Sequence, residues 1–205
     1  MPGLNWPAIE AADLDRDPFD HFMVAQALAP DCAEGIAGEY PAIRSAGSFS
    51  LADAPPGPIL AGLIEDLKSD RFAGEMQRIF DLELTGRPCL ITLRGQCSPR
   101  DGRVHTDSRS KILSLLLYLN EGWQSPEGRL RLLRSPDDIE DYAVEVPPNL
   151  GSLVGFSRSD DSWHGHTPFV GQRRVLQLNY LQSATASWVG GLRHRLSALS
   201  KQRVV

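Results

Sequence analysis

The sequence contains two histidines and one aspartate whose types and spacing could hold a metal ion. His105 and Asp107 stand two residues apart in "GRVHTDSRSK", and His164 follows in "SWHGHTPFVG", just before the last predicted strand. Two imidazoles and one carboxylate occupy one face of an octahedral ion and leave other positions open. This ligand set is typical of non-haem Fe(II), and zinc fits it less well. The sequence therefore predicts an iron site.

The stretch "WHGH" offers a second candidate for the third ligand. His166 lies seven residues before Arg173, whereas His164 lies nine residues before it. We expect His164 to be the ligand. We expect His166 to line the mouth of the site or to bond a loop carbonyl.

A conspicuous arginine, Arg173, opens the last predicted strand. The planar fork of a guanidinium suits bidentate binding of a carboxylate, which predicts a dicarboxylic cosubstrate reaching from the metal to this residue. By strand alternation, Tyr118 shares a face with Ser114, so its hydroxyl could reach the same carboxylate. Ser114 is either a polar wall of that pocket or a tolerated core serine.

The doublet Arg173-Arg174 leaves open which arginine faces inward. Alternation places Arg173 on one strand face with Gln177 and Asn179, and places Arg174 on the other face with leucines. Helices that cover a sheet from outside need an apolar surface beneath them. This argument favours Arg173 as the inward residue.

The segments that must position these residues change character along the chain. The first part, about residues 1–86, has apolar residues at helical spacing, as in "GPILAGLIEDLKSDRFAGEMQRIFDL". From about 87 to 182, short apolar segments separated by turn residues predict strands, among them "PCLITLRGQ", "KILSLLLYLN" and "RRVLQLNYL". No helix-length segment intervenes, so antiparallel pairing in a barrel or jelly roll is expected. Residues from about 185 to 201 return to helical spacing.

Length and composition narrow the classes of protein. The 205 residues, 41% of them hydrophobic, predict one domain over residues 1–205. A net charge of −5 argues against a nucleic-acid partner. The chain has no apolar run near the roughly 18 residues of a membrane span and no signal-like start, which predicts a cytoplasmic protein. Three cysteines without CxxC spacing predict free thiols. The oligomeric state is left open.

Four motifs together resemble the Fe(II)- and 2-oxoglutarate-dependent dioxygenases, in particular their prolyl 4-hydroxylase-like branch. The motifs are "HTD", "LLLYLNEGW", "EGRLRLL" and "PPNLGSLVGFSRSDDSWHGHTPFVGQRRVLQL". The resemblance covers roughly residues 87–182. The resemblance implies a mainly β fold with flanking helices around a cupin-like double-stranded β-helix. It implies iron held by His105, Asp107 and His164, with the 2-oxoglutarate tail at Arg173 and Tyr118.

The same resemblance implies an activity. Dioxygen decarboxylates 2-oxoglutarate to succinate and CO2 while the substrate is usually hydroxylated, with ascorbate as a possible reductant. A prolyl or other protein residue and an amino-acid-like small molecule remain alternative substrates, since specificity resides in loops such as 121–128 and 157–162. A second hypothesis is a non-catalytic sensor that binds iron or 2-oxoglutarate on the same fold. Succinate formation discriminates between the two.

The chain departs from the family pattern at two places. Relatives often carry a tyrosine some nine residues before the first ligand, where this chain has Gln96. Many also show a Gly-Gly pair where this chain has Glu127-Gly128, a difference expected to change only a turn. The first departure leaves the contacts at the iron end of the cosubstrate unassigned.

Overall fold

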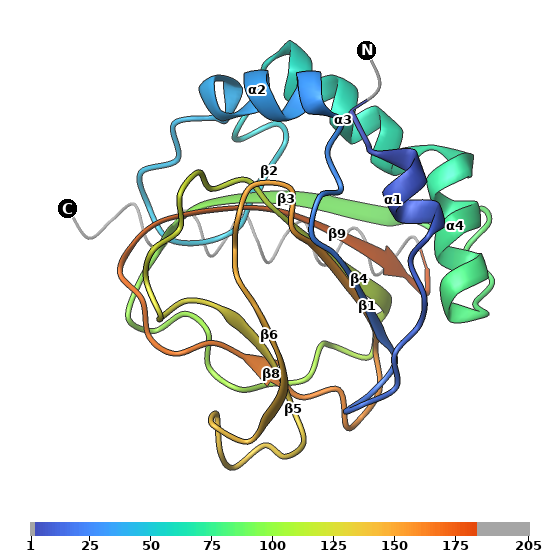
Figure 1. Cartoon of the computed structure of the whole chain (residues 1–205), viewed down its shortest axis with the longest axis vertical. Coiled ribbons are helices and arrows are strands. Elements are labelled where there is room, and N and C mark those ends of the chain that lie inside the picture. Colours follow the sequence, from blue (N-terminus) through green and yellow to red (C-terminus); the bar gives the residue numbers. More distant parts are fainter. Residues whose placement is uncertain (1–2, 184–205) are drawn as a thin grey trace.

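In the part of the chain that the structure describes, four helices occur, all in the N-terminal half (Figure 1). The computed structural model describes residues 3–183, so the helix predicted at about 185–201 lies outside the described residues. The helices are α1 (Trp6–Glu10), α2 (Pro30–Glu39), α3 (Pro58–Lys68) and α4 (Asp70–Phe80). The first three carry proline in their first turn, where its missing N–H costs nothing. Ser69 ends α3 and caps α4, because its hydroxyl accepts a hydrogen bond from the amide of Phe72.

Within residues 3–183, nine strands form two sheets, and every pair of named strands runs antiparallel. The large sheet has the order β1-β7-β4-β9-β3-β2, and the small sheet has the order β6-β5-β8. The strands are β1 (His21–Val24), β2 (Phe49–Ser50), β3 (Cys89–Cys97), β4 (Lys111–Tyr118), β5 (Leu130–Leu133), β6 (Tyr142–Val146), β7 (Leu153–Ser157), β8 (His164–Gly165) and β9 (Gly171–Leu181). This is the predicted jelly roll, a double-stranded β-helix with flanking helices.

The helices cover the outer face of the large sheet, as Figure 1 shows. Alternate residues of the central strands, such as Leu115, Leu176 and Leu178, are buried in one cluster with Leu63 and Phe72 of the helices. Burial of such apolar side chains is the main force that holds helices on a sheet. The leucines of β9 therefore face away from the space between the sheets.

The opposite face of the large sheet looks toward the small sheet. A second apolar cluster joins Tyr118, Phe156 and Val175 to Leu130 and Leu132 of β5. Leu130, Phe156 and Val175 of this cluster also line a cavity between the sheets. The cavity is where the predicted site residues meet.

The N-terminal part also contributes two strands that the sequence pattern did not predict. β1 lies at the edge of the large sheet and pairs with β7, in the register Phe22 opposite Gly155. The Phe22 ring is buried against this glycine, where a side chain at position 155 would collide with it. His21, expected to be an ordinary packing or surface histidine, is buried with Nδ1 2.8 Å from the carbonyl of Phe19.

Two further expectations can be compared with the described residues. None of the helices among residues 3–183 is long and apolar enough to cross a membrane. The three cysteines, Cys32, Cys89 and Cys97, are free thiols, as predicted.

Candidate metal centre and cosubstrate pocket

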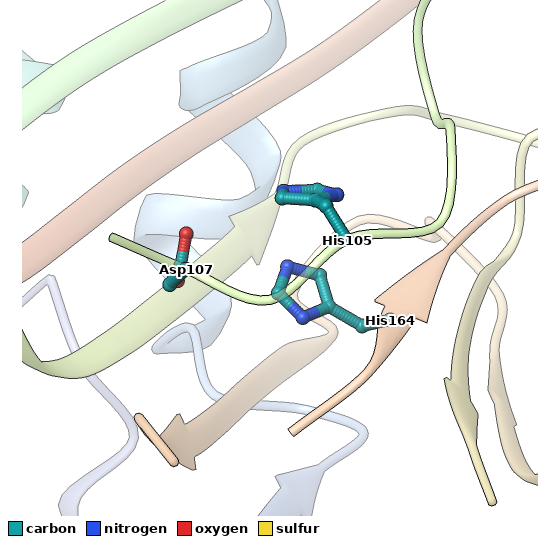
Figure 2. A group of neighbouring side chains, drawn as sticks. All are labelled: His105, Asp107 and His164. Atoms are coloured by element: carbon teal, nitrogen blue, oxygen red, sulfur yellow. The ribbon is translucent and has the colours of Figure 1, made fainter. Parts of the chain in front are cut away.

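The two candidate histidine ligands come from segments whose main chains pair directly. The amide of His105 donates to the carbonyl of His164, and the amide of His164 donates to the carbonyl of His105, both at 3.0 Å. Residues opposed in this way project their side chains on the same side of the pair. The ring centroids lie 4.4 Å apart, and Figure 2 shows both imidazoles beside the carboxyl group of Asp107.

The structure brings His105, Asp107 and His164 into one group. One potential ligand atom from each residue lies within 4.8 Å of the others. Asp107 and His164 are buried, whereas His105 is exposed toward the opening. The backbone of Asp107 is fixed by Arg158, whose Nε donates to its carbonyl oxygen at 3.1 Å.

The hydrogen bonds of both imidazoles leave the correct nitrogen for a metal. Nδ1 of His105 lies 2.8 Å from the carbonyl of Arg103, and Nδ1 of His164 lies 2.9 Å from the carbonyl of Ser162. A carbonyl only accepts, so we infer that each Nδ1 carries the proton and each Nε2 offers its lone pair. This arrangement orients ligating histidines in metal proteins. The donor set therefore fits Fe(II).

The electrostatics of the group favour ligands in their metal-binding protonation states. Burial lowers the pKa of His164 to about 4, so its imidazole is neutral at physiological pH. Burial opposes ionisation of Asp107, but the charge of Lys111, with hydrogen bonds from Lys111 and Ser114, lowers the pKa of Asp107 below its usual value. A carboxylate and neutral imidazoles are what a divalent cation requires.

The group faces a cavity of about 230 Å³ between the two sheets. Both sheets and the connecting loops contribute to its wall. Its lining residues are Ser48, Arg94, Gly102, His105, Asp107, Lys111, Leu116, Leu130, Phe156, His164, Gly165, His166, Arg173, Val175 and Gln177. The wall combines apolar side chains, Leu116, Leu130, Phe156 and Val175, with three cations, Arg94, Lys111 and Arg173.

Arg173 lies in the wall of this cavity and is buried. Its Nε donates to the carbonyl of Gly128 at 2.8 Å, and its Nη2 donates to the hydroxyl of Tyr118 at 3.2 Å. Both partners are uncharged, so neither hydrogen bond gives the buried cation an ion pair. A carboxylate in the cavity would supply that charge.

Arg174 points the other way, as strand alternation predicts. Its Nη1 donates to the carbonyl of Ala37 at 3.0 Å, and its guanidinium lies over the ring of Tyr40. Gln177 lines the cavity on the same face of β9 as Arg173. The apolar side chains of β9 pack under the helices, so the inward face is the polar one.

The comparisons with known proteins agree with this geometry. Residues 96–181 match the model of the 2OG-Fe(II) oxygenase superfamily. This part of the chain is a 2OG-Fe(II) oxygenase domain. The protein is a 2-oxoglutarate-dependent dioxygenase, and its cofactors are Fe(II), 2-oxoglutarate and dioxygen.

Solved structures show the same fold as this oxygenase. A prolyl 4-hydroxylase of Pseudomonas putida superposes with a TM-score of 0.51 at 20% identity, covering 80% of this chain and 88% of that chain. A prolyl 4-hydroxylase of Phytophthora capsici superposes with a TM-score of 0.51 at 19% identity, covering 86% of this chain and 68% of that chain. A search of curated protein sequences finds no significant match.

Ser114 of the oxygenase contacts Asp107, one of the three candidate metal ligands, and not the Arg173 end of the pocket. It is fully buried, and its hydroxyl donates to Oδ2 of Asp107 while lying 2.9 Å from the side-chain oxygen of Asn179. The other oxygen of Asp107 accepts from Lys111 at 2.5 Å. Two neighbours thus hold the carboxylate, and sequence reasoning had assigned neither of them this contact.

His166 lies outside the group of three, in the cavity wall of the oxygenase. Its Nδ1 is 2.8 Å from the carbonyl of Thr167, and its Nε2 is 3.8 Å from the sulfur of Cys97. Burial and the charge of Arg173 lower its pKa to about 4. The sequence analysis expected His166 either to line the mouth of the site or to bond a loop carbonyl, and His166 lies in the cavity wall beside such a carbonyl.

Gln96, which stands where relatives often carry a tyrosine, faces away from the oxygenase cavity. Gln96 pairs with Gln172 on the outer face of the large sheet, beyond an irregularity in β3 between Arg94 and Gln96. Arg94 lies before the irregularity and lines the cavity. Sequence reasoning missed Arg94, because the register of β3 and β9 shifts here and places Arg94 and Gln96 on opposite faces, although strict alternation puts residues two apart on one face.

Proposed function

We propose that this dioxygenase holds Fe(II) through His105, Asp107 and His164, binds the distal carboxylate of 2-oxoglutarate through Arg173 and Tyr118, and hydroxylates an organic substrate. The observation that carries the proposal is the shared cavity. Three potential ligand atoms within 4.8 Å of one another face the same small space as Arg173, a buried arginine that donates hydrogen bonds to a neutral carbonyl and a neutral hydroxyl. That combination suits a metal-chelating dicarboxylic acid.

When bound, Fe(II), 2-oxoglutarate and dioxygen would supply the oxidation: one oxygen atom of O2 would enter succinate as CO2 is lost, and the other would enter the substrate. The chain's own residues contribute geometry. His105 and His164 present Nε2 because their Nδ1 protons are engaged by carbonyls. Lys111 and Ser114 orient Asp107. Leu116, Leu130 and Phe156 give the cavity apolar wall that helps to exclude water.

A prolyl or other residue of a protein is one proposed substrate, and an amino-acid-like small molecule is the other. The structurally similar proteins are named prolyl 4-hydroxylases, which favours a peptide. Residues 121–128 and 157–162 remain the segments expected to select the substrate. Their last residues reach the site, since the carbonyl of Gly128 accepts from Nε of Arg173 and the carbonyl of Ser162 lies 2.9 Å from Nδ1 of His164.

A substrate screen tests the proposal. The protein loaded with Fe(II), 2-oxoglutarate and ascorbate is incubated in air with proline-containing peptides and with free amino acids. Products are examined for the mass of one added oxygen, and succinate is measured in parallel. Asp107→Ala serves as the inactive control. Binding of metal and 2-oxoglutarate without succinate in any condition would favour the sensor hypothesis instead.

A further inference from the structure

A second arginine, Arg94, lies in the same cavity as Arg173. On β3, Arg94 stands opposite Val175 of β9, and Val175 stands opposite Tyr118 of β4. Directly opposed residues project to the same face of a sheet, so the three form a row across neighbouring strands. Arg94 and Tyr118 therefore flank the strand that carries Arg173. Arg94 and Arg173 both line the cavity that contains the metal group.

The backbone at Arg94 is built to keep this residue inward. The Tyr40 hydroxyl lies 2.8 Å from the carbonyl of Arg94 and 3.0 Å from that of Val175. The next residue, Gly95, has no room for a side chain, because a Cβ there would lie 2.6 Å from Cβ of Ile43 and 2.8 Å from its carbonyl oxygen. The bulge at this point turns Gln96 outward and leaves Arg94 as the polar residue of β3 beside the pocket.

An ion pair with Asp101 holds one edge of the Arg94 guanidinium. Its Nη2 donates to Oδ1 of Asp101 at 3.0 Å. Asp101 is itself fixed, since its Oδ2 accepts from the amide and the hydroxyl of Ser98 at 2.7 and 2.9 Å. The Arg94 side chain keeps 28% of its surface accessible. A planar guanidinium with one edge anchored in this way can offer its remaining N–H groups to a carboxylate.

The charges of the cavity favour an anionic ligand beyond the one that Arg173 needs. The lining includes three cations, Lys111, Arg94 and Arg173, and one carboxylate, Asp107. Lys111 is matched by Asp107, and Arg94 by Asp101 at the rim. Fe(II) would add two positive charges and 2-oxoglutarate two negative charges, so with both bound the cavity and its rim keep one net positive charge.

We propose that Arg94 is a second carboxylate-binding residue of the pocket. The proposal rests on the proposed function, since it presumes a 2-oxo acid at the metal group. Its ligand is either the metal-side carboxylate of the cosubstrate or a carboxylate on the primary substrate. Both sources present the same chemistry to the guanidinium, and experiment separates them.

The first arm measures binding without turnover. Protein loaded with Mn(II) in place of Fe(II) is titrated calorimetrically with 2-oxoglutarate and with 2-oxobutyrate, which lacks the distal carboxylate. If the cosubstrate is the source, Arg94→Gln weakens binding of both acids by a similar factor, on the order of tenfold or more. Arg173→Gln should weaken binding of 2-oxoglutarate and leave that of 2-oxobutyrate unchanged.

The second arm applies if Arg94→Gln binds both 2-oxo acids like the wild type. Candidate substrates are then offered as pairs of free acid and amide, with succinate as the readout. If the primary substrate is the source, the wild type prefers the acid over its amide and Arg94→Gln loses that preference. Normal binding of both 2-oxo acids together with no acid preference that depends on Arg94 would overturn the proposal.

Two controls separate binding from structure. Arg94→Lys keeps a cation and should recover part of the lost affinity, whereas equal losses in the Lys and Gln variants with a lowered Tm would indicate a merely structural role and refute the proposal. Arg174→Gln removes the same residue type from the outer face of β9 and should change neither titration. Failure of the wild type to bind 2-oxoglutarate would refute the proposed function itself, independently of Arg94.

Discussion

His105 and His164 exchange both of their main-chain hydrogen bonds, each 3.0 Å long, across 59 residues of sequence (164 − 105). The spacing of the two candidate ligands is therefore set by strand pairing before any metal binds. β8 is also paired with β5, where His164 stands opposite Leu132. The geometry of the site is thus a property of the fold, and ligand substitutions can be tested without unfolding the protein.

The neighbouring histidines should differ in their effect on metal binding. His164→Ala should lose Fe(II), because it removes a buried donor whose Nδ1 is already oriented by the carbonyl of Ser162. His166→Ala should retain Fe(II), since it removes a ring that contacts Thr167 and Cys97. Metal content after dialysis, measured by atomic emission, distinguishes the variants. A metal-free His166→Ala protein beside a loaded His164→Ala protein would reverse the assignment.

The carboxylate of Asp107 is expected to be essential for turnover but not for folding. Asp107→Ala should abolish Fe(II)-dependent succinate formation, because the remaining histidines supply only two ligands. The strands on either side keep their pairing, so far-UV circular dichroism should match the wild type. Both measurements are made on one preparation. Wild-type turnover in this variant would remove Asp107 from the site.

Lys111 is expected to act through Asp107 as a positioning residue. Lys111→Met keeps an apolar stem but removes the ammonium that lies 2.5 Å from Oδ1 of Asp107. Loss of such an outer contact typically weakens metal affinity roughly 10–100-fold, which competition with a metal indicator can measure. Arg109→Gln removes an exposed nearby cation and is the matched control. Equal affinities for Lys111→Met and the control would argue against a positioning role.

Much of the site could be inferred from residue types and alternation. Strand alternation correctly separated the inward Arg173 and Gln177 from the outward leucines, because one face of β9 packs on helices and must be apolar. The antiparallel jelly roll followed from short strands without intervening helices. These inferences depend on local pattern, which the sequence carries directly.

Other features depend on contacts between distant segments. The outward position of Gln96 could not be predicted, because the pairing of β3 with β9 is irregular beside Gly95, which Ile43 crowds, and no local pattern records that contact. β1 was missed because its four residues become a strand only by pairing with β7. The contact from Ser114 to Asp107 likewise joins residues whose side-chain directions depend on the loop between them.

The two arginines of β9 should separate cosubstrate binding from packing. Arg173→Ala removes the buried cation of the pocket, and loss of a buried charge-assisted pair costs on the order of 3 kcal/mol, or about a hundredfold in the 2-oxoglutarate requirement. Arg174→Ala removes a contact with Ala37 outside the pocket and should change that requirement little. Succinate formation is titrated with 2-oxoglutarate for both variants. A large loss confined to Arg174→Ala would mean that the functional face of β9 is the other one.

The pairing of β1 with β7 makes a prediction about stability that is independent of the metal. A Cβ at Gly155 would lie 2.3 Å from Cε1 of Phe22, whose ring is buried between β1 and the helices and so cannot retreat freely. Gly155→Ala should therefore lower the free energy of unfolding by about 1–3 kcal/mol, the usual cost of overpacking. Gly62→Ala is the matched control: it lies in α3 with no atom within 4 Å of the new Cβ, and should raise stability by about 0.5–1 kcal/mol. Urea denaturation followed by circular dichroism measures both. If Gly155→Ala is as stable as the wild type while Gly62→Ala behaves as expected, β1 does not pack on β7 in this register.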